Sequence, residues 1–336
     1  HMRNVHLPAR VKEAHSETAY TVGEAIDFIE REGNAPWALH LSLVKPHWPY
    51  VAPAPYHAMY EAGDALQVHR DPRERVDPHP VYGAYLKQEE CANFARDEVV
   101  AKVRPAYMGL VRQVDDHLAR LWAVLERLGR WEDTLVVFTA DHGDYLGDHW
   151  LGEKELFHDA VQRVPMIVAA PGQLAPGRRD KRLVEAIDMV PTALQALGLP
   201  PARHRVEGAS LLPLLDGQAP PVWRGAAFSE LDYAYRRARL LLGRGPDECR
   251  AWMVRTDRYK YVHWQGYPAQ LFDLGNDPHE IDDRGRDPGL EGVREEMRDR
   301  LREWSLGLKR RTTVALDEVS QKTDAYKQAG VFYGQW

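Results

Sequence analysis

Two loops of this sequence gather residue types that bind metals or anions. Asp141 and His142 follow the apolar run "TLVVFTA", and Lys45 and His47 follow the apolar run "WALHLSLV". Carboxylate and imidazole groups are common ligands of divalent metals, whereas lysine and histidine neutralise anions or transfer protons. Such a set would place cationic or hydrogen-bonding groups beside two potential metal ligands.

Each loop comes at the end of a segment whose pattern is typical of a buried strand, residues 37–44 and residues 134–140. In open α/β sheets, ligands bind in the crevice beyond the carboxyl ends of the strands. If the two strands are parallel neighbours, all four side chains meet at one edge of the sheet. Gly143 and Gly147 would allow the tight turns that such a loop requires.

These residues also have ordinary interpretations. Asp141 could be a helix cap or a turn former, and Lys45 and His47 could lie in an exposed rigid turn between prolines. A lone histidine is more often a satisfied polar residue than a ligand, but the position of His142 beside Asp141 at a strand end favours a ligand. Lys154 would by default be solvated, as most lysines are.

The other acidic residues nearby are interpreted as structural. Asp144 and Asp148 suit turn and surface positions in a glycine-containing loop. Asp115 and Asp116 resemble a pair of catalytic carboxylates, but they fall on the polar side of a long amphipathic helix. We therefore interpret that pair as part of a solvated face.

Helix and strand patterns alternate through most of the chain. Apolar side chains that step by three and four, from Tyr107 to Leu128, predict a long helix that Gly129 ends. Residues 61–94 show no sustained period and predict a long surface excursion. Further patterns predict helices at 20–32 and 189–197 and a strand within 164–172. Alternation with continuous apolar strands indicates an α/β fold with a mostly parallel sheet between helices.

The pattern changes after Trp223. Short segments separated by turn signals, followed by a charged helix, predict a smaller antiparallel sheet with a packed helix. We expect an α/β domain over residues 1–220 that lacks its N-terminal strands, a C-terminal α+β subdomain over 221–310, and a tail over 311–336. Phe332, Tyr333 and Trp336 give this tail aromatic groups that could dock on another subunit.

Composition excludes several classes of protein. The net charge is -6 with cations scattered among acids, which argues against a nucleic-acid partner. No apolar run approaches the roughly 20 residues of a membrane span, so we expect no membrane partner. Cys91 and Cys249 lie far apart and outside any CxxC arrangement, which indicates neither a disulfide framework nor a cysteine-rich zinc site. A reducing, cytoplasmic location fits this cysteine usage.

Three motifs, in order, resemble one known family. They are "LSLVKPHWPYVAPAPYHAMY", "FTADHGDYLGDHWLGEKELFHDAVQRVPMIVAAPG" and "LFDLGNDPHEIDD". The chain is similar, from about Leu7 to Leu306, to the sulfatases and phosphonate monoester hydrolases of the alkaline phosphatase superfamily. The phosphonate monoester hydrolase and phosphodiesterase type is the most similar variant. The resemblance implies an alkaline-phosphatase-like fold and hydrolysis of phosphonate monoesters, phosphate diesters or sulfate esters.

The resemblance also implies roles for individual residues. Asp141 and His142 would bind one divalent metal ion, which could be Mn, Zn, Fe or Ca. Lys154 would contact a non-bridging oxygen of the bound anion, with Lys45 close to the same group. His47 would contact the ester oxygen as the acid for the leaving group. These roles match the charge neutralisation and leaving-group protonation that such ester cleavage requires.

One family motif is missing from this chain. Members carry an N-terminal aspartate pair that completes the metal site and a Cys-x-Pro-x-Arg or Ser-x-Pro-x-Arg motif that becomes the formylglycine nucleophile. Cys91 lies in "EECANFAR" and Cys249 in "DECRAWM", neither with a proline two residues on, and no serine fits. We therefore expect the C-terminal two thirds of such an enzyme, inactive or nearly so without its N-terminal segment.

Two functions from different classes follow. The first is a metal-dependent hydrolase of small anionic esters that needs the missing N-terminal segment as a partner, in an enzyme that we expect to form homo-oligomers. The second is a non-catalytic module for binding or assembly that keeps a truncated sulfatase-like fold. The set Asp141, His142, Lys154 and His47 favours the first, because a scaffold has no physical need for it.

Overall fold

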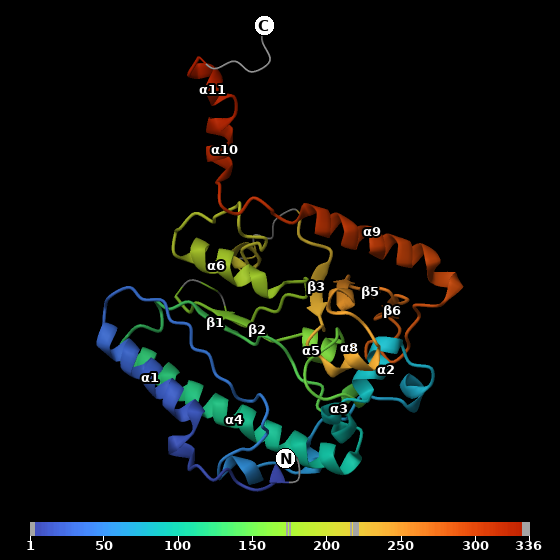
Figure 1. The fold of residues 1–336 in the computed structure, drawn as a ribbon. Helices are drawn as coiled ribbons and strands as arrows, with labels where there is room; N and C mark the ends of the chain where they lie inside the picture. The colour runs from blue at the N-terminus through green and yellow to red at the C-terminus, as the bar shows by residue number, and fades with distance from the viewer. Residues whose placement is uncertain (1–3, 173, 175, 216, 218–221, 331–336) are drawn as a thin grey trace.

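The computed structural model describes residues 4–172, 174, 176–215, 217 and 222–330. A pair of long helices lies on one side of the molecule, α1 (Glu17–Glu32) and α4 (Asp97–Arg127), and α1 packs along the C-terminal half of α4 (Figure 1). Ser16 caps α1 by accepting a hydrogen bond from the backbone N–H of Ala19. The pair forms one wall of the fold, with an apolar core between its helices.

The predicted helix at 20–32 is confirmed as α1, and the predicted helix from Tyr107 is confirmed as part of α4. α4 begins earlier than predicted, at Asp97, and continues through Pro105. Buried Val99 and Val103 extend the apolar stripe of α4 on the N-terminal side of Pro105, so core packing carries the helix past it. Gly129, with a left-handed φ of 65°, follows the end of the helix.

The sheet of the α/β region is small among the described residues. β1 (Val136–Thr139) pairs with β2 (Met166–Ala169), and their register places Phe138 opposite Ile167. The pairing is antiparallel, so the predicted mostly parallel sheet is wrong for the strands that the structure describes. A parallel connection usually crosses the sheet through a helix, whereas residues 140–165 double back as a loop with only two short helices.

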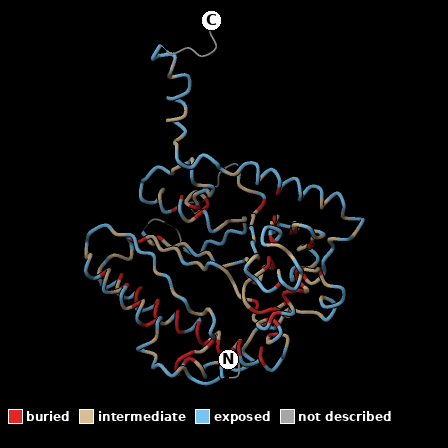
Figure 2. Tube along the Cα trace, in the orientation of Figure 1, coloured by how far each residue is buried: buried red, intermediate tan, exposed pale blue. Residues whose placement is uncertain are grey.

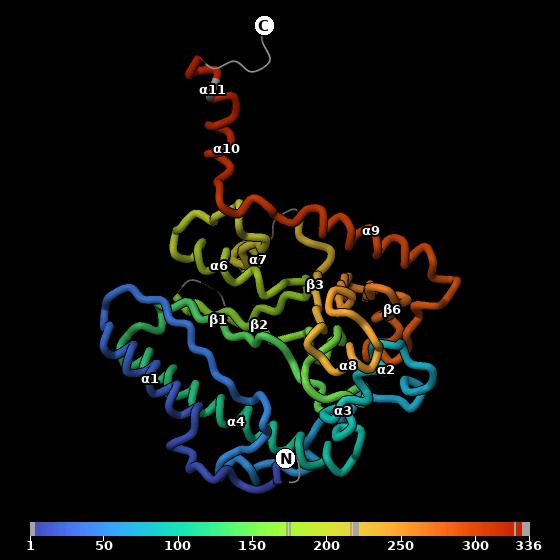
Figure 3. The backbone as a smooth tube through the Cα atoms, viewed as in Figure 1, coloured from blue at the N-terminus to red at the C-terminus, as the bar shows by residue number. Residues whose placement is uncertain are grey.

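The predicted strand at 37–44 is also wrong, because the structure assigns no strand to these residues. Trp37, Leu41 and Leu43 pack against the apolar cluster between α1 and α4, and the segment runs beside this helix pair (Figure 3). An apolar alternating run fits a strand by pattern, but a strand also needs a neighbour for its backbone hydrogen bonds. Packing on the helices satisfies the apolar side chains without that neighbour.

The predicted surface excursion is wrong in its second half. Residues 80–94 form the short helices α2 (Pro80–Leu86) and α3 (Glu89–Phe94), which bury Tyr82, Tyr85 and Phe94. Figure 2 shows buried residues gathered in this region and along the facing sides of α1 and α4. The helices are too short to produce a sustained sequence period, which explains the wrong prediction.

The C-terminal region has the predicted antiparallel sheet and packed helix. The strands β3 (Ala227–Asp232), β4 (Arg250–Arg255), β5 (Tyr259–Trp264) and β6 (Gln270–Asp273) lie in chain order. Helix α9 (Glu291–Gly307) packs on β4 and β5 through Met297 and Leu301. The domain boundaries at 220 and 310 stay predictions.

The remaining elements connect these layers. The predicted helix at 189–197 is confirmed as α6 (Met189–Ala196). The others are η2 (Glu13–His15), η3 (Tyr56–Ala58), η4 (Ala62–Asp64), η5 (Pro72–Arg75), η6 (Asp148–Trp150), α5 (Asp159–Gln162), η7 (Ala186–Asp188), α7 (Leu212–Leu215), α8 (Arg237–Leu241), η8 (Pro246–Glu248), η9 (Pro288–Leu290), α10 (Leu316–Lys322) and α11 (Ala325–Gln328).

The C-terminal helices α10 and α11 extend away from the body of the molecule (Figure 1). The aromatic residues Phe332, Tyr333 and Trp336, predicted as a docking group, lie outside the described residues. Of the helices in the described ranges, none combines the length and the apolar character that crossing a membrane requires.

Candidate active site

The loop after β1 carries the predicted metal ligands and packs against the backbone of α5. The Gly143 N–H donates to the carbonyl of Val161 at 2.8 Å. A Cβ atom at Gly143 would lie 2.2 Å from the carbonyl oxygen of Ala160, far inside van der Waals contact. Only glycine therefore lets the chain pass this close. Gly147, with φ of 101°, makes the second turn that was predicted to need glycine.

His142 is oriented by its own loop. Its Nδ1 lies 2.7 Å from the carbonyl oxygen of Gly143. Because a carbonyl can only accept, Nδ1 carries the proton and Nε2 holds a free lone pair. This Nε2 lies 3.5 Å from Oδ2 of Asp141, whose side chain is 88% exposed. The two atoms are therefore close enough together to contact one metal ion.

The loop after residue 44 carries the predicted anion-binding groups. His47 Nδ1 lies 2.8 Å from the carbonyl oxygen of Trp48, which fixes this proton on Nδ1 as well. Nε2 of His47 therefore accepts, and its partner is Nζ of Lys154 at 2.5 Å. Lys45 instead donates to the carbonyls of His47 at 3.2 Å and Pro49 at 2.8 Å. Burial lowers the pKa of Lys45, against the opposing charge of Glu17.

The structure brings the predicted residues together. The rings of His47 and His142 meet edge to face, with centroids 5.7 Å apart. Lys154, His47, His142 and Asp141 therefore form a continuous chain of contacts across two loops. The loops meet without the parallel strands that were expected to align them. Lys45 lies beside this chain and supports the loop of His47 through its carbonyls.

Sequence reasoning missed a second contact between the same two loops. Tyr50 donates a hydrogen bond of 2.5 Å to Oδ2 of Asp144, and the Leu146 N–H donates to Oδ1 at 3.1 Å. Burial, opposed by these hydrogen bonds, raises the pKa of Asp144 to about 6. Asp144 is thus a turn residue as predicted, but not a surface residue. The bond to Leu146 is readable as a local turn motif, whereas the bond to Tyr50 has no local signal.

The other acidic residues are held in structural contacts. Asp148 accepts from Arg104 at 2.6 Å and from the backbone of His69 at 2.8 Å, so it too is a turn residue that is not on the surface. Asp116 accepts from the hydroxyl of Tyr56 at 2.9 Å, which ties the polar side of α4 to a loop. These carboxylates are already paired and make poor candidates for catalysis.

The donor set fits a metal only in part. Among the described residues, no group of three or more His, Cys, Asp and Glu is arranged to hold an ion. Divalent ions in proteins take about four to eight ligands. Asp141 and His142 have suitable donor types and a suitable orientation, so they fit as part of such a site and would need ligands from elsewhere.

Neither cysteine is placed for nucleophilic chemistry. Cys91 and Cys249 are both buried, and burial raises the pKa of the Cys91 thiol to about 12. A nucleophilic cysteine needs a lowered pKa and access to the substrate. The sequence around each cysteine argued against a nucleophilic role, and the buried environment of both thiols agrees with that prediction.

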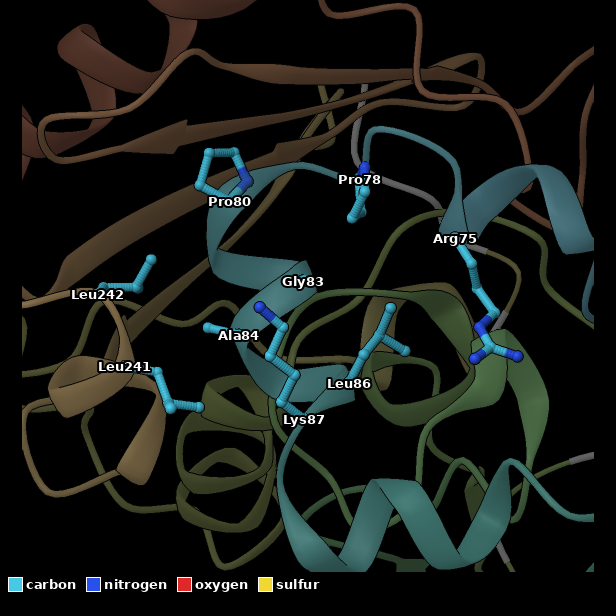
Figure 4. A pocket seen from close by; sticks show the side chains of 9 residues that line it. All are labelled: Arg75, Pro78, Pro80, Gly83, Ala84, Leu86, Lys87, Leu241 and Leu242. Carbon is cyan, nitrogen blue, oxygen red and sulfur yellow. The ribbon is translucent and has the colours of Figure 1, made fainter.

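An open pocket lies away from these residues. It has a volume of about 430 Å³ and lies between α2, α8 and the segment around Arg75 and Pro78. Figure 4 shows Lys87 near its centre, with Leu241 and Leu242 on one side and Arg75 on the other. None of the predicted site residues lines this pocket, so the pocket is not evidence for the position of the active site.

Comparison with known proteins assigns the class. The sulfatase family model matches residues 7–199, and a model for the C-terminal region of N-sulphoglucosamine sulphohydrolase matches residues 147–306. The chain therefore belongs to the sulfatase family, within the alkaline phosphatase superfamily. The family resemblance of the three motifs is confirmed.

Individual relatives point to the same group. A multifunctional alkaline phosphatase superfamily protein of Trinickia caryophylli is 32% identical over 91% of this chain and 62% of its own length. A choline-sulfatase of Rhizobium meliloti is 31% identical over 81% of this chain and 51% of its own length. This chain therefore spans less than two thirds of these relatives.

Solved structures confirm the fold class. The phosphonate monoester hydrolase of Silicibacter pomeroyi has a TM-score of 0.83 at 30% identity, over 92% of this chain and 64% of its own. That of Agrobacterium radiobacter has a TM-score of 0.80 at 30% identity, over 90% of this chain and 66% of its own. The chain has an alkaline-phosphatase-like α/β fold with a C-terminal antiparallel sheet and helix.

Proposed function

We propose that this chain carries the leaving-group side of a sulfatase-type active site. The enzyme would hydrolyse phosphonate monoesters, phosphate diesters or sulfate esters. The observation that carries the proposal is the contact chain from Lys154 through His47 and His142 to Asp141. A cation, a proton-transfer group and two metal-ligand types converge there on one small region.

His47 and Lys154 would exchange partners when an anionic ester binds. In the free chain, Lys154 donates to Nε2 of His47. A non-bridging oxygen of the ester would take over hydrogen bonds from the Lys154 ammonium group, and Nε2 would then be free to take up a proton from solvent. The bond from Nδ1 to Trp48 keeps Nε2 aimed at the leaving oxygen, to which it gives that proton as the ester bond breaks.

Asp141 and Nε2 of His142 would hold a divalent metal ion together with ligands from outside this chain. When bound, such an ion supplies charge neutralisation on the equatorial oxygens of the ester. An imidazole ligand favours Mn, Zn or Fe over Ca, and the identity of the ion stays open among these four.

The nucleophile would come from a segment outside this chain. Both cysteines are buried and lack the family's motif, and only two of the expected metal ligands are present among the described residues. A formylglycine-type nucleophile and the remaining ligands would therefore belong to an N-terminal segment outside this chain. A homo-oligomeric state and a cytoplasmic location stay predictions.

Complementation tests this function directly. The chain would be produced alone and together with a segment that carries an aspartate pair and a Cys-x-Pro-x-Arg motif. Hydrolysis of p-nitrophenyl phenylphosphonate, bis-p-nitrophenyl phosphate and p-nitrophenyl sulfate would then be measured. We expect activity only with the segment present.

Lys154→Ala in the complemented protein provides the decisive comparison. We expect it to lower kcat/KM by about 100-fold or more, the usual size for a lost group that stabilises developing charge. Lys87→Ala, far from the contact chain, is the matched control and should leave the rate unchanged. Equal rates for both variants would contradict the role proposed for Lys154, whereas an absence of hydrolysis with the segment present would favour a binding or assembly role.

A further inference from the structure

The backbone that carries Lys154 is strained on both sides. Glu153 and Leu156 adopt left-handed conformations, with φ of 66° and 78°. Residues other than glycine keep such conformations only where the surrounding structure holds them. Some contact outside this loop must therefore fix it.

One such contact comes from the C-terminal sheet. Lys260 of β5 is fully buried, and its Nζ donates to the carbonyl of Phe157 at 2.8 Å and to Oδ1 of Asp159 at 2.6 Å. Oε1 of Glu280 lies 2.5 Å from the same Nζ. The hydrogen bonds of the ammonium group go to Phe157 and Asp159, and Glu280 adds the charge of an ion pair. Two of the three oxygens belong to the segment that follows Lys154.

The same network holds the start of α5. Oε2 of Glu280 accepts from the backbone N–H of Asp159 at 2.5 Å, and Arg255 donates to both carboxylate oxygens of Asp159 at 3.3 Å. The side chain of Glu280 is 2% exposed and that of Asp159 is 19% exposed. Because α5 contacts Gly143 through Val161, the network reaches the stretch beside His142 as well as the segment that follows Lys154.

A second ion pair acts on the strained loop from the same side. Arg236, which precedes α8, pairs with Glu155 directly after Lys154. The side chain of Glu155 is 10% exposed, so this ion pair lies largely out of contact with solvent on the carboxylate side. The strained loop is therefore held by residues of the C-terminal region at two points, one on each side of Leu156.

We propose that Lys260 is a positioning residue for the active site. Through Asp159 and the Phe157 carbonyl it fixes the loop that presents Lys154 to His47. The C-terminal sheet would then be part of the anion-binding architecture as well as a packing unit. The inference rests on the proposed role of Lys154 in binding the anion, but the contact between Lys260 and the loop can be tested without any substrate.

The test compares Lys260→Met with Arg258→Met in the full chain. Methionine replaces the lysine stem in β5 but leaves Glu280 without the cation of Lys260 and leaves Asp159 with Arg255 alone. Arg258 lies in the same hairpin, its side chain is 61% exposed, and it pairs with Asp273 and not with the loop of Lys154. Backbone hydrogen exchange would be followed by mass spectrometry, and the acylation rate of Lys154 by peptide mapping.

We expect Lys260→Met to speed exchange in residues 153–162 and to raise the acylation of Lys154 by about tenfold. Exchange in β3 and β6 should stay near wild type, which separates positioning from general loss of structure. Arg258→Met should change neither readout. Asp159→Asn, which keeps an acceptor for Lys260 without its charge, should give a smaller effect of the same kind.

Unchanged exchange and acylation in Lys260→Met would overturn the inference, as would faster exchange spread evenly over the sheet. If Lys260→Met unfolds the chain, Asp159→Asn is the variant that tests the inference. Faster hydrogen exchange confined to residues 153–162 would then support it, and exchange that is unchanged or evenly faster over the sheet would refute it. Neither readout requires turnover, so failure here is distinguishable from failure of the proposed hydrolase activity.

Discussion

Nζ of Lys154 lies 2.5 Å from Nε2 of His47. The two residues come from different loops, and each is a potential cation. With the proton of His47 placed on Nδ1 by the Trp48 carbonyl, the contact is that of an ammonium donor and a neutral imidazole acceptor. A bound anion would compete for the Lys154 donor, so we expect anion binding to break the contact between Lys154 and His47.

The first prediction concerns His47 in the complemented enzyme. His47→Ala should lower the rate by about 100-fold or more for esters with alkoxide leaving groups, which need a proton. For p-nitrophenyl esters the loss should be much smaller, because p-nitrophenolate leaves without one. The check is the slope of log kcat/KM against leaving-group pKa in both proteins. Identical slopes would show that His47 is not the acid.

A second prediction concerns the close approach at Gly143. Gly143→Ala should reduce the free energy of unfolding by about 2 kcal/mol or more, because its Cβ would overlap the Ala160 carbonyl. Gly23→Ala is the matched control, since a Cβ there meets nothing within 4 Å on helix α1. It should stabilise by about 0.5–1 kcal/mol. Urea unfolding of the wild type and the two variants measures these changes in free energy. A Gly143→Ala variant as stable as the wild type would show that the loop relaxes around the added Cβ.

The Tyr50 and Asp144 pair gives a third prediction. Tyr50→Phe should cost about 1–3 kcal/mol of stability, because it leaves a largely buried carboxylate without its hydroxyl partner. Tyr107→Phe serves as the control, since its ring packs on Tyr50 and no hydrogen bond of its hydroxyl is found in the described part of the chain. Its cost should be below about 0.5 kcal/mol. Similar costs for both would rule out a special role for the hydroxyl of Tyr50.

His79 gives a prediction for the pH dependence of stability. Its Nδ1 accepts from the Val81 N–H, and its Nε2 donates to the Pro268 carbonyl at 2.9 Å, so the neutral ring is satisfied on both sides. Burial lowers the pKa of His79 to about 4. Because the unfolded state binds the proton first, this stabilisation is complete above pH 6.5 and is lost as pH falls towards 4.

The expected loss from His79 is roughly 3 kcal/mol between pH 7 and pH 4, from a pKa difference of about 2.5 units. Urea unfolding at several pH values would be compared between the wild type and His79→Gln. The variant is expected to be less stable at pH 7 and to lack this part of the pH slope. Parallel pH curves for the two proteins would contradict the assignment.

Sequence reasoning succeeded where structure follows from a local pattern. The apolar stripes of α1 and α4 and the short segments of the C-terminal sheet are periodic, and each was predicted. The strand at 37–44 failed because its pairing depends on another strand, which no local pattern supplies. Asp141, His142, Lys45 and His47 were selected as candidates from residue type and position, whereas Lys154 was assigned a role only through the family resemblance, and these roles stay predictions.

The contacts missed altogether join distant parts of the chain. Tyr50 meets Asp144, and Lys260 meets Asp159, across separations that periodicity does not address. Lys260 is a particular case, since its surroundings in "RYKYVHW" suggest an ordinary strand lysine. Its burial arises only because two acidic side chains and a carbonyl from other elements converge on one point.

The ribbon of β1 and β2 has a consequence for handling the protein. In the described part of the chain these strands pair only with each other, so their outer edges keep free backbone donors and acceptors. Phe138 and Ile167, which are register partners, are 37% and 58% exposed. An open ribbon with an apolar face is a template for aggregation. The chain on its own should precipitate at concentrations that Ile167→Lys tolerates, which light scattering during concentration would measure.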